Sequence, residues 1–368
     1  RSRPSASAWM VNASKSDYPF FAFGEAFNID PAYATSIWVT EQDGSIDYTS
    51  GYFQNGRPGS IERFTYEFVE DNDDQDRIPD WGRNDALATD SAVFPGWDEN
   101  NDFIPDFNQN DNGRVINLIP DYEEPFLRQR VDRPEFLFGI DANNNTWVDR
   151  FENDNEPDLP YKRSRRGWNA YAGAYLRPEV RVTIGRLEED DITSNRRNRS
   201  TYGILNIDLD TPAWGRLRLF DMVKSIKDDL RDDLLQWDNR NTLRNDRNVE
   251  VTDPMLGRDT FRNSVYMAQA ISPLDGLWLH NAVKWDLWHQ RLSKAERQPL
   301  GLAADEYFFG LLNKAEYTMD LGILRVQPRW KSEYRRQSYD LFTGRDRREL
   351  TEIFGTIVEI GRASCRER

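Results

Sequence analysis

The most regular pattern in the chain is an alternation of apolar and polar side chains along several stretches of its second half. Between Leu324 and Tyr334, apolar residues and a serine occupy the even positions, while Arg, Gln, Lys and Glu occupy the odd ones. Between Leu277 and Leu287, Leu, Val and Trp alternate with polar residues that include Lys284. Because successive side chains of a strand point to opposite faces, this period predicts β-strands. The stretches run for roughly 9–12 residues, against a usual strand length of about 5–6.

The links between these stretches alternate between short and long. Short turns rich in Pro, Gly and Asp are expected at 16–19, 176–179, 210–215, 272–276 and 318–321. Long polar links are expected at 188–200, 228–262, 290–305 and 337–350. A further strand pair, predicted at 9–14 and 20–27, places all of 30–165 in one long link. This order predicts an antiparallel, up-and-down arrangement.

Long strands with apolar residues on one face and charged residues on the other, joined by alternating short and long links, resemble bacterial outer-membrane β-barrels. The resemblance implies an all-β fold, a transmembrane up-and-down barrel that is truncated here to roughly eleven strands. It divides the chain into a first hairpin (1–29), a long extracellular segment (30–165) and further barrel strands (166–359). In that family, short turns face the periplasm and long loops face outward.

Two residues on the expected lipid-facing side, Asp221 and Asn281, do not fit this arrangement. A charge at the middle of the bilayer costs about 2–4 kcal/mol. A soluble antiparallel sandwich or barrel would show the same alternation. Aromatic residues such as Trp285 and Trp330 would then be core residues rather than membrane-interface girdles. Both architectures remain open, and a requirement for detergent distinguishes them.

Negative charge is concentrated in one part of the chain. The whole sequence has a net charge of -15, whereas residues 70–160 alone hold 24 acidic and 7 basic residues, a net charge of -17. The remainder is therefore close to neutral. This distribution disfavours binding to nucleic acid through a general basic surface.

Three segments within this acidic region repeat one oxygen-rich pattern, with Asp or Asn at positions 1, 3, 5 and 9 of each copy. This spacing lets a short loop surround a hard cation, because alternate side chains converge while the backbone carbonyl of position 7 fills a gap. The pattern therefore points to Ca2+. The copies consist of Asn72, Asp74, Asp76 and Asp80; of Asp98, Asn100, Asp102 and Asp106; and of Asp141, Asn143, Asn145 and Asp149.

The acidic region also resembles thrombospondin type 3 repeats, in which Asp- and Asn-rich loops wind around successive calcium ions. Carried over by position, the resemblance implies that the oxygens at positions 1, 3, 5 and 9 bind Ca2+. Glu152 adds a carboxylate at position 12 of the third copy, where an EF-hand loop places its bidentate ligand. The chain departs from the calcium-loop pattern at position 6, usually Gly, where Arg77, Phe103 and Thr146 stand. This departure predicts looser geometry or lower affinity.

An unstructured, solvated acidic loop is the alternative interpretation of such a segment. The shared register of the copies and the interleaved aromatic residues, among them Phe136, Phe138 and Trp147, argue against it. Sites in the class of about 0.1–1 mM would suit the outside of a cell. We expect an extracellular cap or plug that calcium makes rigid, and whose residues 70–160 become more sensitive to protease after EDTA.

The sequence contains no catalytic motif that predicts an enzyme. Its two histidines, His280 and His289, lie outside any nucleophile-elbow context. Inward-facing Lys and Arg residues of the expected strands would either favour anionic solutes or pair with inward acids. Those acids are Asp208, Asp286, Glu316 and Glu333. We therefore expect no enzymatic activity, and both interpretations of the inward charges remain open.

The ends of the chain add one expectation. Residues 360–368 resemble a translated sequencing adapter and contain the single cysteine, Cys365, so they are treated as a non-native tail. No signal peptide is visible at the start, which is expected if the chain is a piece of a longer protein.

Two classes of function remain open. The first is a bacterial outer-membrane barrel, acting as a porin, transporter or surface scaffold, with a calcium-stabilised external segment and extracellular long loops. The second is a secreted soluble β-protein with calcium repeats, acting as an adhesin or carbohydrate-binding module. The expected partners are the lipid bilayer, calcium, and small or anionic solutes or extracellular polysaccharide.

Overall fold

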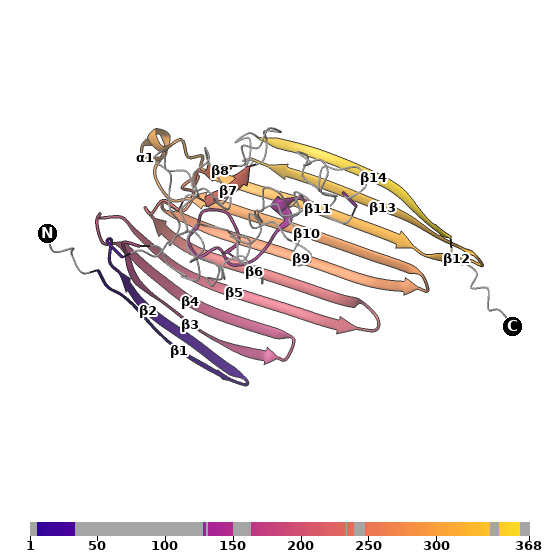
Figure 1. Cartoon of the computed structure of the whole chain (residues 1–368), viewed down its shortest axis with the longest axis horizontal. Helices are drawn as coiled ribbons and strands as arrows, with labels where there is room; N and C mark the ends of the chain where they lie inside the picture. The colour runs from indigo at the N-terminus through magenta and orange to yellow at the C-terminus, as the bar shows by residue number, and fades with distance from the viewer. Residues whose placement is uncertain are drawn as a thin grey trace, which may run out of the picture.

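The computed structural model describes residues 6–33, 128–129, 132–149, 163–232, 234–238, 247–338 and 346–360. These residues form one antiparallel sheet of 12 strands and a separate two-stranded hairpin (Figure 1). The described strands and helices are β1 (Ala8–Asp17), β2 (Phe20–Ile29), η4 (Pro134–Phe136), β3 (Arg165–Arg177), β4 (Val180–Asp191), β5 (Arg197–Thr211), β6 (Gly215–Asp228), β7 (Leu234–Asp238), β8 (Arg247–Val251), β9 (Thr260–Leu274), β10 (Leu277–Gln290), α1 (Lys294–Arg297), η6 (Gln298–Leu300), β11 (Asp305–Tyr317), β12 (Met319–Leu321), β13 (Leu324–Gln337) and β14 (Arg347–Ile360).

The large sheet has the up-and-down order that the sequence predicts. Each strand pairs with its neighbour along the chain, from β1 to β6, then β9, β10, β11, β13 and β14, and β7 and β8 form the separate hairpin. The three-residue β12 continues β11 toward the same turn, which leaves eleven long strands. The all-β, antiparallel architecture is thus confirmed. Among the described strands the sheet is open, because β1 and β14 each have one partner.

Short and long connections lie at opposite ends of the sheet. Figure 1 shows the tight hairpin turns at one end, and α1, β7 and β8 at the other. The clearest differences from the predicted links are the following two. Strands β4 and β5 continue past the expected boundaries and leave only 192–196 between them, while the last short turn lies at 322–323 rather than 318–321. Among the described helices, none is long and apolar enough to cross a lipid bilayer.

The two faces of the sheet differ in chemistry, and the alternation seen in the sequence assigns the residues correctly. On β10, Lys284 is buried on one face, whereas Trp285 and Val283 lie on the other, where Trp285 is 36% exposed. We call the face that holds Lys284 the inner face, and the opposite one the outer face. The exposed face is therefore apolar and the buried face is charged.

The two polar residues that disturbed this pattern remain on the outer face, where each has polar neighbours. Asn263 donates a hydrogen bond to the Asp221 carboxylate at 2.8 Å. Asn281 lies directly opposite Gln269 on one neighbouring strand and Asn313 on the other. Polar side chains are therefore grouped on this face, which limits the desolvation that each group suffers.

Candidate functional site

Residues 132–149, called here the inner segment, lie against the inner face of the sheet. They belong to the long link predicted as extracellular, 30–165. Figure 1 shows the inner segment, in purple, crossing the middle strands of the sheet. The strands meet it with a row of buried cations, called here the basic row: Lys224, Arg262, Lys284, Lys314, Lys331 and Arg335.

The cations of the basic row bind oxygens of the inner segment. Lys224 on β6 donates to the backbone carbonyl of Asp141 at 2.6 Å, and Lys284 on β10 donates to the carbonyl of Glu135 at 2.7 Å. Arg262 on β9 pairs with the Asp141 carboxylate. Because buried ammonium groups need acceptors in place of water, the inner segment satisfies charges that the strands carry inward.

A network of buried ion pairs fixes the start of the inner segment. Asp132 lies 2.7 Å from the ammonium groups of both Lys314 and Lys331. Arg133 pairs with Glu333 at 2.7 Å, and Glu135 pairs with Arg335. Burial alone would raise the pKa of Asp132, but the two ammonium groups outweigh it and hold that pKa below its ordinary value.

Aromatic side chains pack the inner segment onto the sheet as well. Phe138 stacks on Tyr266 with ring centroids 3.8 Å apart, and Phe136 meets Phe308 edge-on at 5.4 Å. Gly310 makes room for this contact, since a Cβ there would lie 2.6 Å from the Phe136 ring. These rings are among the aromatic residues that argued for order in the sequence, and in the described part they pack against the sheet.

The inner segment contains most of the third calcium pattern, folded as a tight loop. The backbone N–H of Thr146 donates to the Asp141 carboxylate at 3.2 Å, and that of Trp147 donates to Asn145 at 2.9 Å. Ala142 donates to Asp149 at 2.8 Å. Thr146, at position 6, has a φ of 85°, the left-handed conformation that a glycine would adopt at this turn.

Two carboxylates face each other across this loop. Asp141 is fully buried, and its Oδ1 atom has no hydrogen-bond partner among the described residues. Burial, and then the nearby Asp141 carboxylate, raise the pKa of Asp149 to about 7, against the opposing charges of Lys224 and Arg262. A cation bound here would relieve this repulsion.

The donor set partly fits a calcium ion. Carboxylates at positions 1 and 9 and amide oxygens at positions 3 and 5 are the hard ligands that calcium takes. Arg262 and Lys224, however, contact the same loop and already supply positive charge to it. Among the described residues, no three His, Cys, Asp or Glu side chains are grouped to hold a metal. Glu152 and all eight residues of the first two copies lie outside the described ranges.

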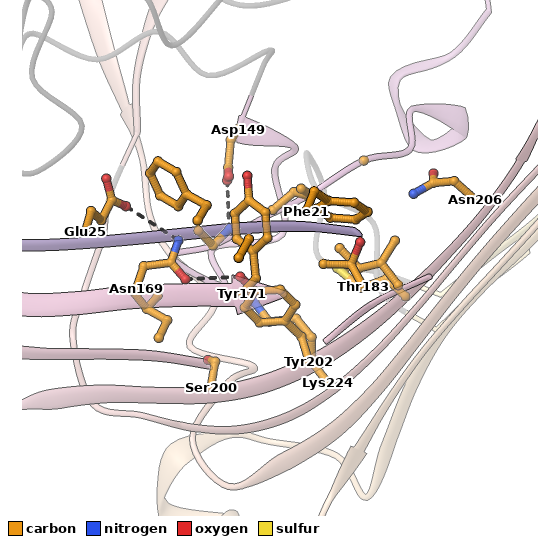
Figure 2. A pocket seen from close by; sticks show the side chains of 18 of the residues that line it. Phe21, Glu25, Asp149, Asn169, Tyr171, Thr183, Ser200, Tyr202, Asn206 and Lys224 are labelled. Carbon is orange, nitrogen blue, oxygen red and sulfur yellow. Dashed lines mark hydrogen bonds between the residues drawn. The ribbon is translucent and has the colours of Figure 1, made fainter. Parts of the chain in front are cut away.

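Beside the loop lies a cavity of about 650 Å³, bounded by the inner face of β1 to β6 and by the inner segment. Figure 2 shows Asp149 on one side of it, with the rings of Phe21 and Tyr171 nearby. Asn169 links two other lining residues, accepting a hydrogen bond from the Tyr202 hydroxyl at 3.0 Å and donating to Glu25 at 3.5 Å. The alternation in the sequence did not reveal this cavity, because it depends on which strands the inner segment leaves uncovered.

The inward charges of the sheet are largely paired. Glu316 pairs with Arg329 at 2.7 Å, Asp208 with Arg216 at 2.7 Å, and Asp286 with Arg262 at 3.3 Å. The pairing interpretation is therefore confirmed for these acids. The sequence did not predict that the chain's own inner segment supplies further partners, because neither spacing nor period encodes such distant contacts.

Among the described residues, the two histidines have different partners. The ring of His280 stacks on Trp278 at 5.7 Å, and Asp286, six residues further along β10, accepts hydrogen bonds from Arg262. His289 forms an exposed pair with Asp305 at 2.7 Å.

The chain has no match among known protein families, curated proteins or solved structures.

Proposed function

We propose that this chain is part of a bacterial outer-membrane β-barrel, a porin, transporter or surface scaffold, whose interior holds the inner segment and a calcium ion bound to it. The observation that carries the proposal is the reversed polarity of the sheet. Charged side chains are buried on the inner face, and large apolar side chains are exposed on the outer face. Water penalises such an outer face, whereas the hydrocarbon core of a bilayer favours it.

The exposed apolar residues recur from strand to strand. The outer face of the middle and flanking strands carries Ile184, Val223, Met267, Trp285, Leu311 and Phe354, which are between 36% and 76% exposed. Apart from β12, the strands of the sheet are 10 to 15 residues long. A tilted strand needs about 9–11 residues to cross a bilayer. The length of the strands and the apolar character of the outer face thus both support placement of the sheet in a bilayer.

Closure of the barrel would require partners for β1 and β14, whose outer edges have none among the described strands. In lipid, an unpaired edge is costly because no water replaces the missing hydrogen bonds. We propose that further strands of a longer protein, or those of a second copy, complete the ring.

Flotation tests the membrane placement directly. The refolded chain is mixed with preformed liposomes and centrifuged through a density gradient, and a matched sample is kept in buffer without detergent. We expect the protein to float with the lipid and to aggregate in plain buffer. A chain that stays monomeric in buffer and does not float contradicts the proposal and supports the secreted soluble β-protein with calcium repeats.

Calcium binding rests on the unpartnered Oδ1 atom of Asp141 and on the raised pKa of Asp149. An ion bound only by the folded protein would stabilise the inner segment by mass action. Titration calorimetry of Ca2+ into wild type and Asp141→Asn checks this site. Because Asp141→Asn also weakens the pair with Arg262, Asp149→Asn is the second variant. A calcium isotherm that neither variant alters excludes the third copy as a binding site.

A further inference from the structure

The cavity beside the inner segment has the size and the lining of a ligand site. Its volume of about 650 Å³ lies within the range of roughly 300–1,000 Å³ that is typical of small-molecule sites. The inner face of β1 to β6 forms one wall, and residues of the inner segment form another. The basic row holds the inner segment against β6 and the strands that follow it. The cavity therefore lies over β1 to β6, beside the inner segment.

Aromatic rings form a strip along one side of this cavity. Phe23 and Tyr171 are stacked with centroids 5.2 Å apart, and Phe21 meets Tyr175 at 5.5 Å. Phe21 also contacts the edge of Tyr171 at 6.4 Å. The rings therefore follow β2 and β3 along the strand direction. Such a strip offers flat apolar surfaces over a length of several residues.

Two glycines let rings lie close to the sheet. A Cβ at residue 173 would lie 2.3 Å from the Phe21 ring, and one at Gly185 would lie 2.3 Å from the Tyr202 ring. Both rings cover backbone instead of projecting across the cavity. Among the described residues, the space above these rings is open to a ligand.

Polar side chains accompany the rings, among them Asn169, Thr183, Asn206 and the carboxylate of Glu25. Figure 2 shows Glu25 and Asn169 toward one end of the strip, with Thr183 and Asn206 toward the other. A side-chain amide offers both donors and acceptors, and a hydroxyl offers one donor with two lone pairs. An amide and a hydroxyl together can therefore hydrogen-bond to neighbouring hydroxyl groups on a ligand.

The charge around the cavity is balanced. Four acidic and four basic side chains line it. Arg165 is paired with Glu189 at 3.4 Å and with Asp232 at 3.2 Å. A lining whose formal charges balance favours a neutral ligand over an anionic or cationic one.

We propose that this cavity binds a neutral oligosaccharide, with sugar rings lying on Phe21, Phe23 and Tyr171 and hydroxyl groups bonded to Asn169, Glu25 and Asn206. The apolar C–H faces of a sugar pack on aromatic rings, while its hydroxyl pairs need the mixed donors and acceptors found here. The part of β5 from Ser200 to Asn206 runs along the cavity wall for on the order of 20 Å, a length that accommodates several sugar units. The site depends on the sheet and the inner segment, so it goes beyond the membrane placement.

Equilibrium dialysis with three labelled probes, maltohexaose, cellohexaose and xylohexaose, tests the site on the refolded full chain. We expect at least one to bind with a 1:1 ratio, and Tyr171→Ala to weaken that binding at least tenfold. The matched control is Tyr334→Ala, which removes a ring from the outer face and should leave the affinity unchanged. Polyethylene glycol of similar length, which lacks hydroxyl pairs, should not compete.

A second variant guards against loss of folding in Tyr171→Ala. Asn206→Trp leaves the aromatic strip in place and fills one end of the cavity, so it should abolish binding without disturbing the rings. The proposal is overturned if none of the three probes binds to the folded protein, or if binding survives both cavity variants. Flotation of the same samples reports membrane placement independently, so failure of one proposal does not imply failure of the other.

Discussion

The inner and outer faces of this sheet are built from the same strands yet have opposite relations between polarity and burial. On β6, the inward Lys224 is 2% exposed, while the outward Val223 is 38% exposed. A protein folded in water normally shows the reverse. Burial here follows the inner segment rather than hydrophobicity, because the charges are covered by the groups that pair with them.

The first way to break this contrast is to remove a carboxylate from the buried network. Asp132→Ala leaves the ammonium groups of Lys314 and Lys331 buried without that partner, and we expect a loss of about 3–5 kcal/mol in the free energy of unfolding. Urea denaturation measures it. Asp320→Ala is the control, because its pair with Arg325 is exposed and should contribute little. Equal effects of the two variants would contradict the role given to the network.

The second way is to place a charge on the outer face. Leu311→Arg lies near the middle of β11, and in a bilayer we expect it to lower stability by about 2–4 kcal/mol. The same change at Leu321, near the short-turn end, should cost about 0–1 kcal/mol because it approaches the interface. Folding titrations in liposomes compare them. If both positions tolerate Arg equally, the outer face does not meet hydrocarbon.

A smaller loss of stability is expected when a methyl group is added to a glycine of the inner face. Gly185→Ala pushes against the Tyr202 ring, and such overpacking should cost about 1–3 kcal/mol and weaken the hydrogen bond from Tyr202 to Asn169. Gly203→Ala is the matched control on the outer face, since the nearest atom to its new Cβ lies 3.9 Å away. Urea midpoints of both variants decide the matter, and a larger loss at Gly203 would refute the assignment of faces.

A further prediction concerns pH. Because the pKa of Asp149 is about 7 in the folded protein and near 3.8 in an ordinary carboxyl group, the folded chain retains a proton that the unfolded chain releases. Without calcium, this group therefore stabilises the fold below about pH 4, and that contribution is lost as the pH rises through 7. Asp149→Asn should make the free energy of unfolding less dependent on pH over this range. The groups that face Asp149 are Asp141, Lys224 and Arg262.

Urea midpoints between pH 4.5 and 8 in EDTA, for wild type and Asp149→Asn, measure this dependence. Added Ca2+ should stabilise the wild type most at pH 8, where the carboxylate is ionised, and should stabilise the variant less. An identical pH slope in both proteins would show that Asp149 does not titrate in this range.

The sheet could be predicted from the sequence because its signal is local. The period of two around Lys284 and Trp285 assigns both residues to the correct faces, and the alternation of links gives the strand order. The turn near Gly322 was misplaced, since β12 extends the hairpin further than the Pro, Gly and Asp content suggests. Such boundaries depend on cross-strand pairing rather than on composition.

The candidate sites were predictable only in part. The third calcium pattern marks Asp141 and Asp149 correctly as neighbours, because both lie within one short loop. Its contact with Arg262 joins residues 121 positions apart and leaves no periodic trace in the sequence. The cavity beside Tyr171 depends on packing across several strands, which a single sequence does not encode in any short motif.

The inner segment also constrains the order in which the molecule assembles. Most pairings within the sheet join strands that follow each other closely, and such local contacts form early at low entropic cost. The bond between Lys314 and Asp132 instead spans 182 positions, so it forms only once distant strands are in place. We therefore expect docking of the inner segment to follow the pairing of the strands that it contacts.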